Sequence, residues 1–325
     1  MRKFERLLVT GGAGFIGSAF LRAIFKDNRF AQAKQIYILD LLTYAGKLEN
    51  IAEILADDRF VFIHGDINDV KGHFQNLSIP DGIIHFAAES HVDRSISDAT
   101  PFISTNIVGT YKLLEWAREN SVEIFLHVST DEVYGSIPSG SAIEDSNLNP
   151  SSQYSASKAS SDLIVLANSY TFNQPVIVTR CTNNYGPFQD LEKLIPTIIG
   201  NAKNNKKIPI YGSGLNVRDW LFVEDHVSAL ITLLIHGEAG QVFNISGSNE
   251  LSNLDVASGI LEEMRKPLSL IEFVEDRKGH DLRYSLDSTK LESQHGWKPQ
   301  VDFKEGVRKT IHWYLSKLDH QKETI

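Results

Sequence analysis

A threonine and two adjacent carboxylates, Thr130, Asp131 and Glu132, come at the end of an apolar run at residues 124–129. β-Branched and aromatic residues fill the run and polar residues bound it, which predicts a buried strand. A carboxylate at the end of a buried strand loses hydration, so it needs a partner or a chemical role. Taken alone, such an acid pair is more often solvated or caps a helix. The three residues are therefore candidates for proton-transfer chemistry.

A second reactive pair, Tyr154 and Lys158, is spaced by about one helical turn. Residues four apart lie on one face of a helix. An ammonium group stabilises a nearby phenolate, so we expect Lys158 to lower the pKa of Tyr154 below about 10 and make it a general base near neutral pH. Ligands of parallel sheets bind beyond the carboxyl ends of the strands, so Thr130 is expected to converge with this pair.

The elements that must position these groups alternate between strand and helix. Strand-like runs recur at residues 7–10, 35–40, 60–65, 82–87, 124–129 and 175–180. The alternation predicts an α/β protein with a Rossmann-type doubly wound parallel sheet. After residue 180 it gives way to loops rich in Asn, Gly and Pro, so we expect a smaller α/β C-terminal substrate-binding lobe. The predicted domains are residues 1–179, with a return segment near residues 217–247, and residues 180–325.

The segment TGGAGFIGS, residues 10–18, joins the first predicted strand to a helical pattern. Its glycines Gly11, Gly14 and Gly17 allow a tight turn and let backbone N–H groups approach a pyrophosphate. Asp40 ends the next predicted strand, where an acid binds the ribose hydroxyls and repels a 2′-phosphate. The first domain is therefore predicted to bind NAD, with a glycine-rich turn lacking any ligand as the alternative. Asp66 and Ile67 follow the third predicted strand and are expected near the adenine.

The composition excludes several classes of function. A net charge of −9 and a pI near 5.7 argue against nucleic-acid and anionic-membrane binding, which need clustered Lys and Arg. The single cysteine, Cys181, fits a reducing compartment, and no apolar run reaches the ~18 residues of a membrane span. We expect a soluble, cytoplasmic protein. His85 and His91 match no strong ligand motif and are interpreted as structural, so no metal is expected.

Several motifs together resemble known enzymes. The glycine turn, the strand-end Ser129-Thr130 and the Tyr154/Lys158 pair resemble the extended short-chain dehydrogenase/reductase superfamily, which implies hydride chemistry at a sugar carbinol. Two additional carboxylates suggest two additional proton transfers. A closer resemblance, to the dTDP-glucose 4,6-dehydratase family, covers nearly the whole chain and rests on the segments DLLTYAG (40–46), HFAAESHVDRS (85–95), STDEVYG (129–135), YSASKA (154–159), RCTNNYGP (180–187), RDWL (218–221) and DRKGHD (276–281).

The resemblance implies a role for each catalytic residue. Tyr154, helped by Lys158, deprotonates the sugar C4 hydroxyl, Thr130 hydrogen-bonds at the same centre, and NAD takes the C4 hydride. The resulting ketone acidifies the C5 proton, which Glu132 removes while Asp131 protonates the departing C6 hydroxyl. The hydride then returns to C6 and a proton to C5, yielding a 4-keto-6-deoxy sugar nucleotide for deoxysugar biosynthesis, for example of rhamnose.

The resemblance also implies binding residues, matched position by position. Besides Gly11, Gly14 and Gly17, the implied NAD contacts are Phe15, Ile16, Asp40, Asp66, Ile67, Ala87, Ala88, Thr105, Tyr154, Lys158 and Asn184. Besides Thr130, the implied contacts of the nucleotide-sugar substrate are Ser90, Asn183, Lys193, Leu194, Pro209, Tyr211, Arg218, Asn253, Arg277 and His280. Lys193, Arg218 and Arg277 have the charge and N–H donors that suit a diphosphate. A homodimer is implied by the resemblance alone.

Other functions remain open at this point. A UDP-sugar 4-epimerase would share the glycine turn, Thr130, Tyr154 and Lys158 but would not need Asp131 and Glu132. A 4,6-dehydratase could act on another nucleotide-hexose. A non-catalytic NAD-sensing regulator could use the same fold, since fold alone does not establish activity, although it would have no need of Tyr154 and Lys158.

Overall fold

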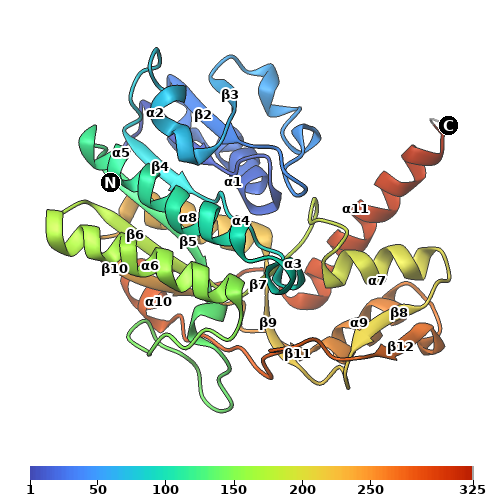
Figure 1. The fold of residues 1–325 in the computed structure, drawn as a ribbon. Coiled ribbons are helices and arrows are strands. Elements are labelled where there is room, and N and C mark those ends of the chain that lie inside the picture. The colour runs from blue at the N-terminus through green and yellow to red at the C-terminus, as the bar shows by residue number, and fades with distance from the viewer. Residues whose placement is uncertain (324–325) are drawn as a thin grey trace.

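The computed structural model describes residues 1–323, with side chains described as far as residue 318. Seven strands form one parallel sheet in the order β10-β6-β5-β4-β1-β2-β3 (Figure 1). Their bounds are β1 Arg6–Thr10, β2 Gln35–Asp40, β3 Phe60–His64, β4 Gly82–His85, β5 Ile124–Thr130, β6 Val176–Cys181 and β10 Gln241–Ile245. The strand order reverses between β1 and β4, and the crevice at such a reversal is where open α/β sheets bind ligands.

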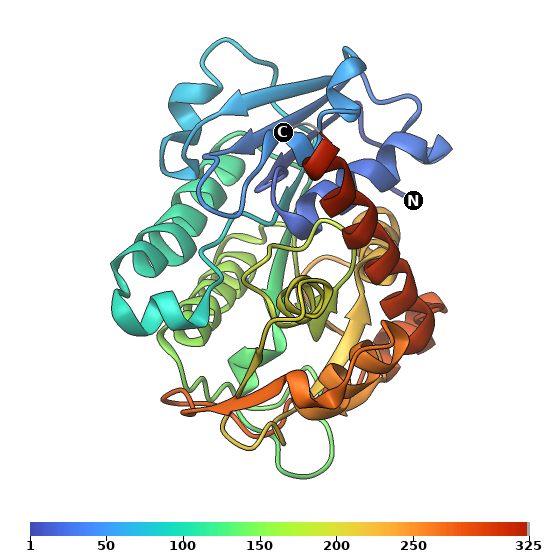
Figure 2. The same cartoon turned by 90° about the vertical axis from the view of Figure 1, so that its right-hand side faces the viewer.

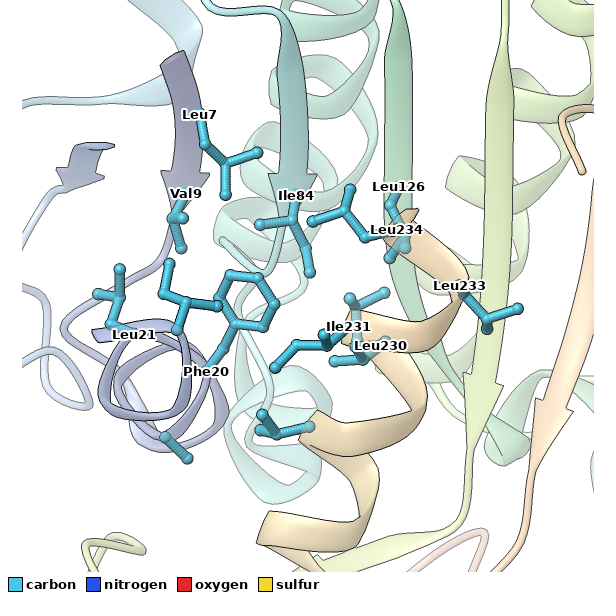
Figure 3. Close-up of a cluster of buried hydrophobic side chains, with 14 of the residues drawn as sticks. Leu7, Val9, Phe20, Leu21, Ile84, Leu126, Leu230, Ile231, Leu233 and Leu234 are labelled. Carbon is cyan, nitrogen blue, oxygen red and sulfur yellow. The ribbon is translucent and has the colours of Figure 1, made fainter. Parts of the chain in front are cut away.

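Helices cover both faces of this sheet, as the near-continuous apolar strands require. Helices α1 (Phe15–Lys26) and α8 (Val223–His236) pack on one face, and α5 (Thr110–Glu119) and α6 (Gln153–Phe172) on the other. Successive strand side chains point to opposite faces. Figure 3 shows one of the two resulting layers, with side chains of β1, β4 and β5 facing those of α1 and α8, among them Leu7, Val9, Ile84, Leu126, Phe20, Leu21, Leu230 and Ile231.

A smaller lobe is built around two short sheets. Strands β7 (Asn183–Tyr185), β9 (Val217–Phe222) and β11 (Glu250–Ser252) form one, and β8 (Ile208–Tyr211) pairs with β12 (Ile271–Val274) in the other. They share a core with helices α7 (Leu194–Lys203), α9 (Asn253–Glu263) and α11 (Phe303–Glu323). Helix α11 runs from this lobe back to the first one, as Figure 2 shows, where Lys317 pairs with Glu49 at 3.1 Å.

Short elements complete the chain. The remaining helices are α2 (Val70–His73), α3 (Val92–Ser97), α4 (Thr100–Phe102) and α10 (Thr289–His295). Turns of 3₁₀ helix are η1 (Asn28–Phe30), η2 (Leu48–Asn50), η3 (Ile54–Ala56), η4 (Ile67–Asp69), η6 (Asp131–Tyr134) and η7 (Leu268–Leu270), and η5 (Ile103–Gly109) is a π-helix. Within residues 1–323, none of the helices has the length and apolar character to cross a membrane.

The predicted fold class is confirmed, with all six predicted strands in the parallel sheet. Strand β4 ends at His85 rather than residue 87, and the chain then passes close to the glycine turn, where a Cβ on Gly11 would lie 2.6 Å from Ala87 N. The predicted return segment contains parts of both lobes. Strand β10 pairs in the main sheet and α8 packs against that sheet, whereas β9 pairs within the smaller lobe. The division into domains at residue 180 stays a prediction.

Candidate active site

The carboxyl end of β5 forms a capped turn that carries the two acids. Thr130 ends the strand and is the N-cap of η6, where its hydroxyl oxygen accepts a hydrogen bond from Glu132 N–H at 3.3 Å. The same hydroxyl donates to Asp131 Oδ1 at 3.1 Å. A threonine N-cap satisfies a free donor of the turn and fixes where the chain leaves the sheet. The acid pair therefore lies at the carboxyl end of the sheet, because Thr130 starts a helical turn there.

Helix α6 holds Tyr154 and Lys158 in its first turns. The helix begins at a capping box between Ser152 and Ser155, which satisfies two backbone donors reciprocally. The Lys158 ammonium is buried and donates to Val128 O of β5 at 2.9 Å. Burial lowers the pKa of Lys158 to about 8, and the charge of Asp162 opposes that change.

The expected effect of Lys158 on Tyr154 is wrong for this structure. Burial of its hydroxyl raises the pKa of Tyr154 well above its usual value, and the charges of Glu132 and Asp131 raise it further, while a hydrogen bond with Thr130 opposes the rise. The Lys158 ammonium is directed at the Val128 carbonyl instead. The spacing of Tyr154 and Lys158 is visible in the sequence. The carboxylates of Asp131 and Glu132 come from η6 rather than α6, so the spacing could not predict their effect on the pKa of Tyr154.

Asp131 and Glu132 differ in their surroundings. Burial raises the pKa of Asp131 well above its usual value and the charge of Glu132 raises it further, although Arg218 opposes the rise. Asp131 Oδ2 has no hydrogen-bond partner in the described part of the chain. Burial also raises the pKa of Glu132, but three cations oppose that rise, Arg218, Lys193 and Arg277. Such a pair suits one protonated acid beside one carboxylate base.

A cavity of about 320 Å³ extends from the glycine turn to the acid pair. Gly11 has a φ of +67°, and a Cβ on Gly17 would lie 2.3 Å from Gly11 O, so the turn accepts no side chain at either position. Gly14, the N-cap of α1, makes no side-chain cap. The lining includes every residue predicted for the cofactor: Gly11, Gly14, Phe15, Ile16, Gly17, Asp40, Asp66, Ile67, Ala87, Ala88, Thr105, Tyr154, Lys158 and Asn184.

Asp40 stands at the end of β2 in this lining. Its carboxylate accepts hydrogen bonds from Ala13 N–H at 2.9 Å and Leu42 N–H at 2.8 Å, which ties it to the glycine turn. Burial raises its pKa, and the two backbone donors oppose that rise. A carboxylate held at the carboxyl end of β2 can accept hydrogen bonds from ribose hydroxyls, and it repels a 2′-phosphate. The cradle of glycines and this acid fit a dinucleotide without a 2′-phosphate.

A second cavity, of about 310 Å³, adjoins the first and shares Glu132, Asn183 and Lys193 with it. All the predicted substrate residues except Thr130 line it, namely Ser90, Asn183, Lys193, Leu194, Pro209, Tyr211, Arg218, Asn253, Arg277 and His280. Thr130 lines the first cavity instead. The structure therefore brings the predicted residues into one continuous site, with Glu132 where its two parts meet.

The three predicted cations are held by neighbours within this site. Arg218 donates to Val217 O at 2.7 Å and Asp281 O at 2.9 Å, and it lies over the Tyr284 ring at 4.2 Å. Arg277 lies 3.6 Å from Asp93 and over Tyr211 at 5.1 Å. Lys193 donates to Ser90 O at 3.1 Å.

Some lining residues were not predicted. His91, interpreted as structural, lines both cavities and lies 3.4 Å from Glu192, whereas His85 is buried between Thr10 and Thr110. Others that the sequence reasoning missed are Tyr44, Glu89, Gln189, Asp190, Asp281 and Tyr284. They lie in loops without local periodicity, so only the motif segments around them could have pointed to them. Cys181 also lines the first cavity, but burial raises its pKa to about 12, so it is a poor nucleophile.

Fold and site together define a class: an extended short-chain dehydrogenase/reductase with a dinucleotide cavity and an adjoining cationic cavity. A family model described as GDP-mannose 4,6 dehydratase matches residues 8–310. A dTDP-glucose 4,6-dehydratase of Actinoplanes sp. is 47% identical, over 95% of this chain and 97% of its own length. In Escherichia coli K12, dTDP-glucose 4,6-dehydratase 1 is 46% identical, over 96% and 93%.

Solved structures agree with these relatives. A dTDP-glucose 4,6-dehydratase from Streptomyces venezuelae, crystallised with NAD bound, superposes with a TM-score of 0.93 at 47% identity and covers 97% of this chain and 98% of its own. A UDP-glucuronic acid 4-epimerase from Bacillus cereus reaches a TM-score of 0.88, at only 27% identity, over 96% and 99%. The backbone is thus shared with epimerases, whereas the sequence favours the dehydratases. The chain belongs to the dTDP-glucose 4,6-dehydratase family.

Proposed function

We propose that this protein is an NAD-dependent hydro-lyase that converts dTDP-glucose into dTDP-4-keto-6-deoxyglucose, a precursor of deoxysugars. One observation carries the proposal: the Asp131/Glu132 acid pair faces the same cavity as Tyr154 and Lys158. The first pair suits the elimination of water and the second suits the oxidation of an alcohol. When bound, NAD supplies the hydride acceptor that returns its hydride at the end of each turnover.

The chain's own residues divide the remaining work. Tyr154 takes the proton of the C4 hydroxyl as a phenolate, which requires the positive charges of Lys158 and of bound NAD to offset the burial that raises its pKa. Thr130 donates a hydrogen bond at the same centre. The C4 ketone acidifies the C5 proton, which Glu132 removes as a carboxylate. Asp131, whose pKa burial raises well above its usual value, gives its proton to the C6 hydroxyl as water leaves. Glu132 returns a proton to C5 when the hydride returns to C6. Lys193, Arg218 and Arg277 are proposed to bind the diphosphate.

The raised pKa of Asp131 favours a dehydratase over an epimerase. An epimerase removes and returns a hydride at one carbon and has no hydroxyl to expel, so a buried acid beside a second carboxylate would only destabilise it. In a dehydratase, the same arrangement supplies the proton for the leaving hydroxyl. A regulator that only senses NAD would use neither pair.

Proton NMR of the purified protein with dTDP-glucose in deuterated water tests the proposal. We expect a new C6 methyl signal, deuterium at C5 and transfer of the original C4 hydrogen to C6. A parallel tube with UDP-glucose ranks the nucleotide bases. A change of configuration at C4 without a methyl signal would replace the proposal with an epimerase, and inertness towards both sugars would reject it.

We further propose a homodimer formed by the outer faces of η5, α5 and α6. These faces carry exposed apolar side chains, of which Tyr170 is 92% exposed, Leu163 57% and Tyr111 49%. Clustered exposed apolar groups on one face are typical of an interface. Light scattering should give a dimer mass for the wild type and a monomer mass for Leu163→Glu. A monomeric wild type would reject the proposal.

We also propose a cytoplasmic location, since the chain has a single cysteine and that residue is buried. Cell fractionation with a tagged full-length chain tests this. Recovery with the membrane or secreted fraction would contradict it.

A further inference from the structure

The two catalytic pairs lie on different elements that a buried polar bridge connects. Tyr154 and Lys158 belong to α6, and Asp131 and Glu132 belong to η6. Behind them, Arg180 of β6 donates from Nε to Asp162 Oδ2 of α6 at 2.8 Å. From Nη1 it donates to the hydroxyl of Tyr134 in η6, also at 2.8 Å. We call Asp162, Arg180 and Tyr134 the buried bridge.

The geometry of the bridge depends on the arginine fork. A guanidinium presents donors in fixed directions, so Arg180 can bind α6 and η6 at once. Its carbon also lies 4.9 Å from the centre of the Tyr134 ring. The far end is anchored too, because Tyr134 OH donates to Asn244 Oδ1 of β10 at 2.9 Å. The three bridge side chains are at most 3% exposed.

The bridge ends next to both catalytic pairs. Asp162 follows Lys158 by four residues, which places both on one side of α6. Tyr134 lies two residues after Glu132 within the same short turn. A shift of Arg180 would therefore move the turn that carries the acids relative to the helix that carries the base.

Charge in the bridge makes the connection costly to break. Arg180 and Asp162 form a buried ion pair, and His127 Nε2 lies 3.4 Å from Asp162 Oδ1. Burial lowers the pKa of His127 to about 4, so it remains neutral. A buried ion pair contributes little net stability, but loss of one partner is strongly unfavourable. The arrangement suits a role in fixing geometry better than a role in stability.

We propose that Asp162, Arg180 and Tyr134 are positioning residues. They fix the position of the Asp131/Glu132 pair on η6 relative to the Tyr154/Lys158 pair on α6. This inference rests on the proposed dehydration. The oxidation at C4 requires mainly the Tyr154/Lys158 pair. The loss of water from C5 and C6 requires the Asp131/Glu132 pair to be correctly placed relative to the Tyr154/Lys158 pair. Weakening the bridge should therefore slow elimination more than oxidation.

Tyr134→Phe removes the hydroxyl at the end of the bridge and keeps the ring. We expect C4 oxidation within about threefold of wild type and elimination slower by about tenfold, as a small misplacement of catalytic groups would cause. The reduced cofactor should then accumulate transiently in a single turnover, measured by its near-ultraviolet absorbance. Tyr37→Phe is the matched control, because it removes a buried tyrosine hydroxyl that donates to Gln35 on β2. A purely structural role would slow both steps equally.

A measurement without substrate keeps the test independent of the proposed function. Asp162→Asn changes a residue of α6, yet we expect faster amide hydrogen exchange at residues 131–134 of η6 by about tenfold, with exchange in β2 unchanged. Arg180→Lys retains the charge but not the fork and should have the same effect if the asparagine variant folds poorly. Unchanged exchange in η6 would overturn the inference. A wild type that fails to dehydrate dTDP-glucose would reject the function while the exchange result still decides the bridge.

Discussion

Replacing Lys158 by methionine should abolish activity and yet stabilise the fold. Lys158 is buried, and burial lowers its pKa from 10.5 to about 8. A difference of one in pKa corresponds to about 1.4 kcal/mol, so the folded state bears a cost of roughly 3 kcal/mol for holding the charged form at neutral pH. Methionine has a similar length and no charge.

The expected gain is smaller than this cost. The variant loses the charged hydrogen bond to Val128 O, which contributes about 2 kcal/mol. The net expectation at pH 7 is therefore a free energy of unfolding larger by about 1 kcal/mol. The exposed Lys3 provides a control, since Lys3→Met should change stability by less than about 0.5 kcal/mol.

The gain should depend on pH in a defined direction. Below pH 8 both the folded and unfolded states of the wild type bind the lysine proton, so the full cost is present. Between pH 8 and 10.5 the folded state releases the proton first, the unfolded state binds more protons, and wild-type stability from this group rises with pH. The difference between variant and wild type should therefore shrink between pH 7 and pH 10.

Urea denaturation of both proteins at the two pH values, followed by far-ultraviolet circular dichroism, measures the difference. A Lys158→Met variant less stable than wild type at pH 7 would refute the reasoning. So would a difference of the same size at pH 7 and pH 10, because it would come from packing rather than from a buried charge.

Three other changes test separate parts of the site. Asp131→Asn should lower formation of the C6 methyl product, followed by NMR, by about a hundredfold or more while C4 oxidation survives; equal loss of both would contradict its role as the acid. Gly17→Ala places a Cβ 2.3 Å from Gly11 O and should weaken NAD retention, measured by gel filtration, at least about tenfold, whereas unaltered retention would contradict the tight turn. Arg277→Lys loses the planar donor fork and should raise KM for dTDP-glucose about tenfold without affecting NAD retention; an unchanged KM would remove it from the diphosphate site.

The sequence was sufficient for features that depend on neighbouring residues. The period of the apolar runs predicted six parallel strands, and the glycine turn followed from spacing and from Asp40 at the end of β2. The direction of the change in the pKa of Tyr154 was mispredicted, because it depends on burial and on Asp131 and Glu132, which approach from another element. Long-range contacts of this kind leave no local pattern.

The same limit explains the residues that were missed. Arg218 was assigned from a motif, but Tyr284 beneath it and Asp281 beside it come from the far end of the chain. Strand β9 was expected to return with α8 to the first lobe, yet it pairs with β7 and β11. A run of β-branched and aromatic residues predicts a strand without specifying which sheet it joins.

The late position of β10 has a consequence for how the protein is made. Strand β10 is one edge of the main sheet, and helix α8 covers one face of that sheet. Both are translated after β7, β8 and β9 of the smaller lobe. At about 5–20 residues per second, a ribosome needs several seconds to pass from β6 to the end of β10. During that interval the nascent sheet has an unpaired edge at β6 and an uncovered apolar layer that includes Leu126 and Ile177. We therefore expect the unfinished chain to bind chaperones, and a fragment ending at residue 179 to aggregate rather than fold as an independent NAD-binding unit.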